Sequence, residues 1–208
     1  HSKHSFPITG AKKINLIDWL CEKVYYSKYL PKPGDIVLDI GTGYGHEVVW
    51  LNERVSGINY VCIEPNPEVF CYLRLNTAHL NNVELINCFV GDKKSVTFSI
   101  NLDYASSDSI ISSDFGWKVE GISLSVIIDK YEKIDLLKLN IEGGELDLLT
   151  NNNLDKVNRI IVSCHDFRGI RGDGDFFYTY EKVSNSLREK GYKITNLEIE
   201  DYPNSSWE

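Results

Sequence analysis

Apolar residues recur along the chain with two spacings, and each spacing predicts one kind of element. Short apolar runs that end at a glycine, proline or polar residue predict strands at residues 36–40, 60–64, 83–90, 134–141 and 157–164. Apolar residues at intervals of three and four predict helices at residues 15–29, 48–55, 67–80 and 178–190, with another that begins near residue 146. This alternation predicts an α/β fold with a doubly wound, mostly parallel sheet and helices on both faces.

Three further segments have the pattern of additional strands, at residues 95–100, 122–128 and 192–199. A polar insertion that contains Trp117 separates the first two. Long polar segments at the ligand-binding end of a sheet often shape substrate pockets, although a surface loop is the simpler interpretation. The aromatic-rich stretch at residues 176–180 would suit stacking on a sugar ring.

Length and composition predict one domain. A chain of 208 residues with 42% hydrophobic composition can bury one sizeable core. We therefore expect a single domain over residues 1–208, in which residues 1–33 form a leading helical segment and residues 34–208 form a Rossmann-like core. The chain contains no methionine, which indicates a processed or trimmed fragment.

Charge and cysteine usage limit the classes of partner. The formal net charge is −8 and no long basic run is present, so nucleic acid is not an expected partner. No apolar stretch reaches the length of a membrane span. The 5 cysteines show no C-x-x-C pairing, which favours reduced core cysteines in a cytoplasmic protein.

The strand at residues 36–40 leads into a turn that contains Gly41, Gly43 and Gly45. Asp39 lies at the end of this apolar strand, where a buried carboxylate is costly unless a partner or ligand compensates it. A dinucleotide site requires G-x-G-x-x-G, which would place the third glycine at His46, and an acid before the turn would repel a diphosphate. An acid suits a ligand with an ammonium and a sulfonium, which favours S-adenosylmethionine. An ordinary strand-to-helix turn is the alternative.

More polar residues follow the next two strands. Glu64 ends the second strand, at a separation from Asp39 close to that at which such folds place an acid on ribose hydroxyls. Asn66 precedes a proline that opens a helix, so it also suits an N-cap that needs no ligand. Asp92 could accept a hydrogen bond from an adenine amino group or stabilise a turn. The predicted cofactor-binding residues are Asp39, Gly41, Thr42, Gly43, Glu64, Asn66, Gly91 and Asp92.

Four motifs occur in order over about residues 35–165. They are the glycine turn at 39–45, Glu-Pro-Asn-Pro at 64–67, residues 82–83 with 90–92, and Lys-Leu-Asn-Ile-Glu-Gly-Gly-Glu at 138–145. Together they resemble the FkbM family of S-adenosylmethionine-dependent methyltransferases. The resemblance implies a class I methyltransferase fold, whose seven-stranded sheet has an antiparallel last strand. It also implies O-methylation of a hydroxyl, commonly on a sugar or natural product.

Two residues depart from the family pattern. The family usually has an aspartate where this chain has Asn140, and an acid where it has Ser163. Because those acids could hold a metal or act as a base, a catalytically inactive, methyltransferase-like binding module is an alternative function. An NAD-dependent oxidoreductase shares the fold and is a second alternative, which His46 and Asp39 disfavour.

Methyl transfer to a hydroxyl requires alignment of the acceptor oxygen, and a general base accelerates it. His165, at the end of the fifth strand, is the first candidate base, and Glu142 is the second. A buried imidazole satisfied by the backbone is the alternative for His165. Glu145 suits the positive N-terminal end of the following helix.

The same residues could also be considered as ligands of a metal ion. Glu142, Asn140 and His165 could together bind a divalent cation, but Asn140 offers only a neutral oxygen, so we assign no metal site. The expected partner is a small-molecule or glycan hydroxyl acceptor. The sequence indicates nothing about oligomeric state.

Overall fold

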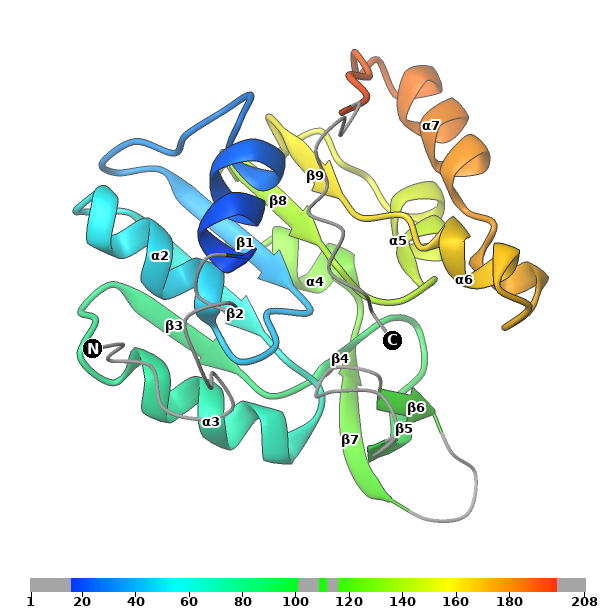
Figure 1. The fold of residues 1–208 in the computed structure, drawn as a ribbon, viewed down its shortest axis with the longest axis horizontal. Coiled ribbons are helices and arrows are strands. Elements are labelled where there is room, and N and C mark those ends of the chain that lie inside the picture. Colours follow the sequence, from blue (N-terminus) through cyan, green and yellow to red (C-terminus); the bar gives the residue numbers. More distant parts are fainter. Residues whose placement is uncertain (1–15, 101–108, 112–115, 198–208) are drawn as a thin grey trace.

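A computed structural model of the chain describes residues 16–100, 109–111 and 116–197 (Figure 1). Five parallel strands form the main sheet in the order β3-β2-β1-β8-β9. They are β1 (Ile36–Ile40), β2 (Asn59–Ile63), β3 (Val83–Ile86), β8 (Leu136–Leu139) and β9 (Ile160–Val162). This order places the strand before the glycine turn at the centre of the sheet.

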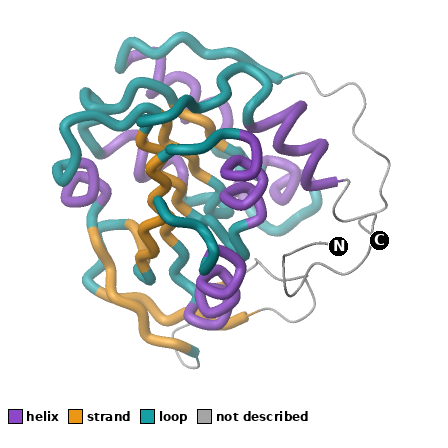
Figure 2. The backbone as a smooth tube through the Cα atoms, turned by 90° about the vertical axis from the view of Figure 1, so that its left-hand side faces the viewer, coloured by secondary structure: helices purple, strands orange, loops and turns teal. Residues whose placement is uncertain are grey.

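Helices cover both faces of this sheet, so the predicted doubly wound arrangement is confirmed (Figure 2). One face carries η1 (Leu20–Tyr25), α2 (His46–Arg54) and α3 (Pro67–Thr77), and the other carries α4 (Leu124–Ile128), α5 (Glu145–Asn151) and α7 (Tyr180–Glu189). The predicted leading helix comprises residues 16–19 and a π-helical continuation, η1. Two short helices that the apolar pattern did not predict, α6 (Asp166–Ile170) and η2 (Asp175–Phe177), follow β9.

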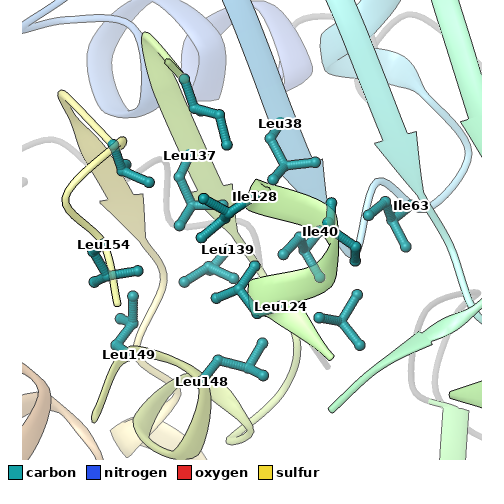
Figure 3. Close-up of a cluster of buried hydrophobic side chains, with 14 of the residues drawn as sticks. Leu38, Ile40, Ile63, Leu124, Ile128, Leu137, Leu139, Leu148, Leu149 and Leu154 are labelled. Carbon is teal, nitrogen blue, oxygen red and sulfur yellow. The ribbon is translucent and has the colours of Figure 1, made fainter. Parts of the chain in front are cut away.

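Alternate residues of the central strands point into two different cores. Leu38 and Ile40 of β1 pack with Leu124 of α4 on one face (Figure 3). Val37 packs on the opposite face with Leu51 of α2. Because both faces are covered, apolar residues occupy almost every position of these strands. A charged residue within them therefore needs a partner in the interior.

A second sheet of four strands lies below the main sheet in the view of Figure 1. Its order is β4-β7-β5-β6, with β4 (Phe89–Val90), β5 (Ser95–Ile100), β6 (Ser109–Ile111) and β7 (Trp117–Ile122). The strand predicted at 95–100 is confirmed. The single strand predicted at 83–90 is wrong, because it divides into β3 and β4 at Asn87. The Asn87 amide donates to the carbonyl oxygens of Glu64 at 2.8 Å and Pro65 at 3.0 Å, and this fixes the chain as it leaves the main sheet.

The strand predicted at 122–128 is also wrong, since most of this segment is helix α4. Leu124, Ile127 and Ile128 have helical spacing and are buried, whereas Val126, which a strand pattern would bury, is 55% exposed. Trp117 begins β7, and most of the polar insertion before it lies outside the described residues.

No strand follows α7 in the part of the chain that the structure describes. Residues 192–197 have no regular structure, so the predicted strand is wrong there, and residues 198–199 lie outside the described ranges. The hydroxyl of Tyr192 donates to the carbonyl oxygen of Val157 at 2.6 Å, which anchors the segment through a side chain. The main sheet thus has five strands in the described residues, not the seven that the resemblance implied. No helix there has the length and hydropathy needed to cross a membrane.

Candidate active site

The carboxyl ends of β1, β2 and β8 border a cavity of about 790 Å³. Open α/β sheets bind ligands at this edge, and the cavity has the size of a small-molecule site. Its lining comprises residues 40–44, 46–47, 64–65, 88–93, 140–142, 144, 147–148, 151–152 and 176–177, with Arg168. The cavity is therefore the candidate site for both a cofactor and an acceptor.

The three glycines of the turn have positive φ angles of 81°, 60° and 80°. A Cβ atom at Gly41 would collide with the backbone oxygen of Asn140, and one at Gly45 would lie 2.6 Å from a methyl group of Leu73. Gly43 lines the cavity and has open space at the corresponding position. Gly41 and Gly45 therefore let the turn pack on its neighbours, while Gly43 leaves room for a ligand beside the backbone.

Glu64 connects the glycine turn to the start of α3. Its Oε2 accepts a hydrogen bond from the Gly43 N–H at 3.0 Å, and its Oε1 accepts one from the Asn66 N–H at 2.8 Å. Burial raises the pKa of this carboxyl to about 7, although both backbone hydrogen bonds favour the ionised form. Each oxygen has a further lone pair, so Glu64 can accept ligand hydroxyls while it holds the turn.

The raised pKa of Glu64 predicts that stability depends on pH. The Glu64 carboxyl binds a proton more tightly in the folded protein than in the unfolded chain. Its contribution to the free energy of unfolding is therefore fully present below pH 4.5 and is lost as the pH rises through about 7. Glu64→Gln cannot ionise and should flatten this part of the profile. Urea unfolding across the range measures the effect. An unchanged slope in the variant would contradict this assignment.

Asp39 does not line the cavity, contrary to the sequence prediction. Its carboxylate is fully buried, with Oδ1 3.1 Å from Nζ of Lys138 and Oδ2 accepting from the Tyr60 hydroxyl at 2.8 Å. Asp39 and Lys138 are paired in register on β1 and β8. The expectation that Asp39 and Glu64 jointly hold a cationic ligand is therefore corrected, because a lysine of the sheet already compensates Asp39.

Lys138 remains charged although it is 1% exposed. Glu47, which lines the cavity, lies 3.9 Å from its ammonium, and the ring of Tyr25 in η1 lies 4.9 Å away. Burial alone would lower the pKa of Lys138, but the carboxylates of Asp39 and Glu47 raise it well above its usual value. This buried cluster joins the centre of the sheet to the leading helix.

The other predicted cofactor residues divide between the cavity and the scaffold. Thr42, Gly91 and Asp92 line the cavity. The buried hydroxyl of Thr42 also joins the ends of β1 and β2 through backbone hydrogen bonds. Asn66 does not line the cavity, and its side chain caps α3 by accepting from two backbone N–H groups. The structure thus gives Asn66 the N-cap role that the sequence left open.

Glu142 lines the cavity in the loop that follows β8. It is the only non-glycine residue of the described chain with a positive φ, at 57°. Its Oε1 lies 3.1 Å from Nε2 of His165, and its Oε2 accepts from Arg168 at 2.9 Å. Burial would raise the pKa of Glu142, but His165 and Arg168 lower it below its usual value. The carboxylate is therefore ionised, in a backbone conformation that its surroundings must hold.

His165 is buried beside this loop and does not line the cavity. Its Nδ1 lies 3.2 Å from Glu145, the first residue of α5, and its Nε2 faces Glu142. Burial alone would lower the pKa of His165, but these two carboxylates raise it to about 9. A general base needs an unprotonated nitrogen within reach of the substrate. The structure therefore corrects the expectation that His165 is the base.

The same geometry does not suit the cation site considered for Glu142, Asn140 and His165. An imidazole must be neutral to bind a metal, and both ring nitrogens of His165 already face carboxylates. In the described residues, no three His, Cys, Asp or Glu side chains form a group suited to a metal ion.

The two departures from the family pattern lie in different places. Asn140 lines the cavity, close to Gly41 of the turn. Ser163 does not line it, and its hydroxyl instead contacts Tyr25 of the leading helix. Only the change at position 140 therefore bears directly on the chemistry of the cavity.

The sequence pattern did not indicate Arg168, because α6 has only five residues and no apolar periodicity. Its guanidinium stacks 4.2 Å over the ring of Phe177, and its Nε lies 2.9 Å from Asp173. Phe176 packs against Gly143, where a Cβ atom would collide with its ring. Both phenylalanines line the cavity, and the aromatic-rich stretch was the sequence signal for them.

Comparison with known proteins agrees with this geometry. The sequence matches the family model described as the methyltransferase FkbM domain over residues 39–194. The chain belongs to the FkbM methyltransferase family. Precorrin-6y C5,15-methyltransferase from Geobacter metallireducens has a similar fold, with 14% identity, a TM-score of 0.50, and coverage of 89% of this chain and 76% of that chain. No curated protein matches the sequence.

A second solved structure supports the class I methyltransferase fold of this FkbM-family chain. Aeropyrum pernix fibrillarin, in complex with natively bound S-adenosyl-L-methionine, is 14% identical with a TM-score of 0.51, and the match covers 88% of this chain and 69% of that chain. The parallel sheet described above confirms the expected fold class. Because the chain belongs to the FkbM methyltransferase family, the alternative of an NAD-dependent oxidoreductase is set aside.

Proposed function

We propose that this FkbM-family chain is an S-adenosylmethionine-dependent O-methyltransferase that acts on a hydroxyl of a sugar or natural product. One observation carries the proposal. A single cavity is lined by the glycine turn and Glu64 and also by Asn140, Glu142 and two phenylalanines. Methyl transfer requires a donor and an acceptor held in contact, and the cavity offers a place for each.

The chemistry of the lining fits the cofactor. Bound S-adenosylmethionine would supply a methyl group activated by its sulfonium. Glu64 would accept hydrogen bonds from ribose hydroxyls, and Asp92 one from an adenine amino group. Five carboxylates face only two cationic side chains in the lining, Glu47, Glu64, Asp92, Glu142 and Asp147 against Lys93 and Arg168. Lys138 beside Glu47 and His165 beside Glu142 offset part of this negative charge, and the remainder favours a cationic ligand.

Other residues of the cavity lining suit a hydroxyl acceptor. Glu142 is ionised and has a lowered pKa, so it orients a hydroxyl better than it removes its proton. Asn140 adds a donor and an acceptor, and the rings of Phe176 and Phe177 offer apolar faces to a sugar or aromatic ring. We assign Glu142 to orienting the acceptor oxygen.

Isothermal titration with S-adenosylhomocysteine and with NADH tests the cofactor. We expect saturable binding of S-adenosylhomocysteine and none of NADH. Incubation with methyl-labelled S-adenosylmethionine and a panel of sugars, glycosides and phenols then tests the acceptor by mass spectrometry. Absence of S-adenosylhomocysteine binding would overturn the proposal, and transfer confined to carbon or nitrogen acceptors would overturn O-methylation.

A catalytically inactive binding module is the second candidate, because Asn140 replaces the usual aspartate within the cavity. We expect Asn140→Asp to raise turnover about tenfold, since it adds a carboxylate that can serve as a general base. Asn151→Asp is the matched control, as Asn151 lines the cavity from α5. An equal gain from both variants would show a general charge effect. Unchanged turnover in Asn140→Asp would show that the missing aspartate does not limit catalysis.

A further inference from the structure

Charged side chains from separate segments meet behind Glu142. Glu142 lies in the loop after β8, Glu145 begins α5, His165 precedes α6, and Arg168 belongs to α6. The imidazole of His165 lies between the two glutamates, at 3.1 Å and 3.2 Å, and its side chain is only 8% exposed. The His165 side chain is thus more buried than that of Arg168, the other charged partner of Glu142, which is 15% exposed.

We propose that His165 is a positioning residue, held as an imidazolium between Glu142 and Glu145, that directs the Glu142 carboxylate into the cavity. The inference rests on the proposed function, which assigns Glu142 to the acceptor oxygen. His165 itself does not line the cavity, so it acts through Glu142.

The hydrogen-bond geometry favours the protonated ring. A neutral imidazole has one donor nitrogen and one acceptor nitrogen, whereas an imidazolium has two donors. Both ring nitrogens of His165 lie at hydrogen-bond distance from carboxylate oxygens, which only accept when ionised. A neutral ring would therefore set a lone pair against one carboxylate. The backbone of Ile141 also donates to Glu145 at 3.3 Å, which fixes the far end of the bridge.

The strained backbone of Glu142 gives this bridge a function. A positive φ at a non-glycine residue is strained and persists only where the surroundings enforce it. His165 holds Oε1 of Glu142 and Arg168 holds Oε2. Arg168 is in turn fixed by Asp173 at 2.9 Å. The carboxylate is thus held from two sides with its charge still at the cavity.

The contact of protonated His165 with Glu142 and Glu145 depends on pH. The titratable and charged groups in or beside the cluster are Glu142, Glu145, Arg168, Cys164, Asp166 and Asp173. The two glutamates hold the pKa of His165 at about 9, above its usual 6.5. Its contribution to stability is therefore complete below pH 6.5 and is lost as the pH rises through about 9.

Nuclear magnetic resonance of the histidine rings tests the charge state without any ligand. Nitrogen-15 spectra should show both nitrogens of His165 protonated at neutral pH, with a titration near pH 9 that moves to lower pH in Glu142→Gln. His165→Gln assigns the signal. A neutral His165 at pH 7, or a titration that Glu142→Gln leaves unchanged, would overturn the inference.

Ligand affinities test the positioning role. S-adenosylmethionine carries a sulfonium charge that S-adenosylhomocysteine lacks, so a directed Glu142 carboxylate favours the former. We expect Glu142→Gln to shift the ratio of the two dissociation constants against S-adenosylmethionine by about threefold to tenfold. Loss of the positive charge in His165→Gln would by itself favour S-adenosylmethionine, so a shift in the same direction as in Glu142→Gln would show that the Glu142 carboxylate has turned away from the cavity. His165→Lys, which keeps a positive charge, should partly restore the ratio, and His79→Gln at an exposed histidine should not change it.

A merely structural role of His165 would weaken both ligands alike, and that result would overturn the inference. If His165→Gln fails to fold, Arg168→Gln releases the other oxygen of Glu142 and allows the same comparison. If the unmodified protein binds neither S-adenosylmethionine nor S-adenosylhomocysteine, the proposed function is refuted. The nuclear magnetic resonance experiment would still decide the charge state of His165.

Discussion

Replacement of Glu64 by alanine should weaken the binding of S-adenosylhomocysteine by about 100-fold at neutral pH. The change removes an acceptor for ribose hydroxyls and also leaves the N–H groups of Gly43 and Asn66 without their side-chain partner. Hydrogen bonds to charged groups contribute about 1.5–3 kcal/mol each, and about 1.4 kcal/mol corresponds to a tenfold change in affinity. Isothermal titration measures the difference directly.

Two variants control for side effects of this change. Glu64→Gln keeps the shape and one acceptor oxygen, so it should retain an intermediate affinity. Glu68→Ala removes an exposed glutamate from the first turn of the neighbouring helix α3 and should leave affinity unchanged. Affinity of Glu64→Ala within about threefold of the unmodified chain would remove Glu64 from the cofactor site, because it would correspond to less than one hydrogen bond.

Removal of either partner of the Asp39–Lys138 ion pair should lower the free energy of unfolding by about 3–5 kcal/mol, because it leaves a buried charge without compensation. Asp39→Ala and Lys138→Met test this by urea unfolding. The sequence suggested a direct role for Asp39 in cofactor binding, but its carboxylate contacts Lys138 and Tyr60 inside the protein. We therefore expect stability to fall much more than affinity.

The double variant Asp39→Ala with Lys138→Met provides the control. An apolar pair in the same space leaves neither charge unpaired, so its loss of stability should be smaller than the sum of the two single losses. Additive losses would show that the two side chains do not depend on each other. A large fall in S-adenosylhomocysteine affinity in a fully folded Asp39→Ala protein would restore Asp39 to the cofactor site.

The places of β1, β2, β8 and β9 along the chain could be predicted because burial on both faces leaves a clear pattern in the sequence, whereas their order in the sheet comes from the structure. That pattern also showed that Asp39 is buried, but it could not show what compensates the charge. Asp39 and Lys138 are 99 residues apart and meet only through strand register. The sequence therefore indicated that a partner exists without indicating that the partner is a lysine of β8.

The role of His165 also could not be predicted fully from the sequence. Its place at a strand end predicted a position near the cavity, and its usual pKa suggested a base. The pKa depends on Glu142 and Glu145, which approach the ring from another segment of the chain. The break after β3 likewise depends on contacts of Asn87 with the segment after β2. Spacing along the chain does not encode such contacts.

The long separation of β1 and β8 also affects how the protein folds as it is synthesised. β1, β2 and β3 can pair early, but β1 gains its second neighbour only after the chain has reached β8. Closure of so long a loop is slow and entropically costly, so β1 is a temporary edge strand of the nascent sheet. Asp39 then places a charge on that edge, and such charges oppose aggregation through open strands. An acid that is paired in the finished protein thus lies on an open edge of the sheet while the chain is incomplete.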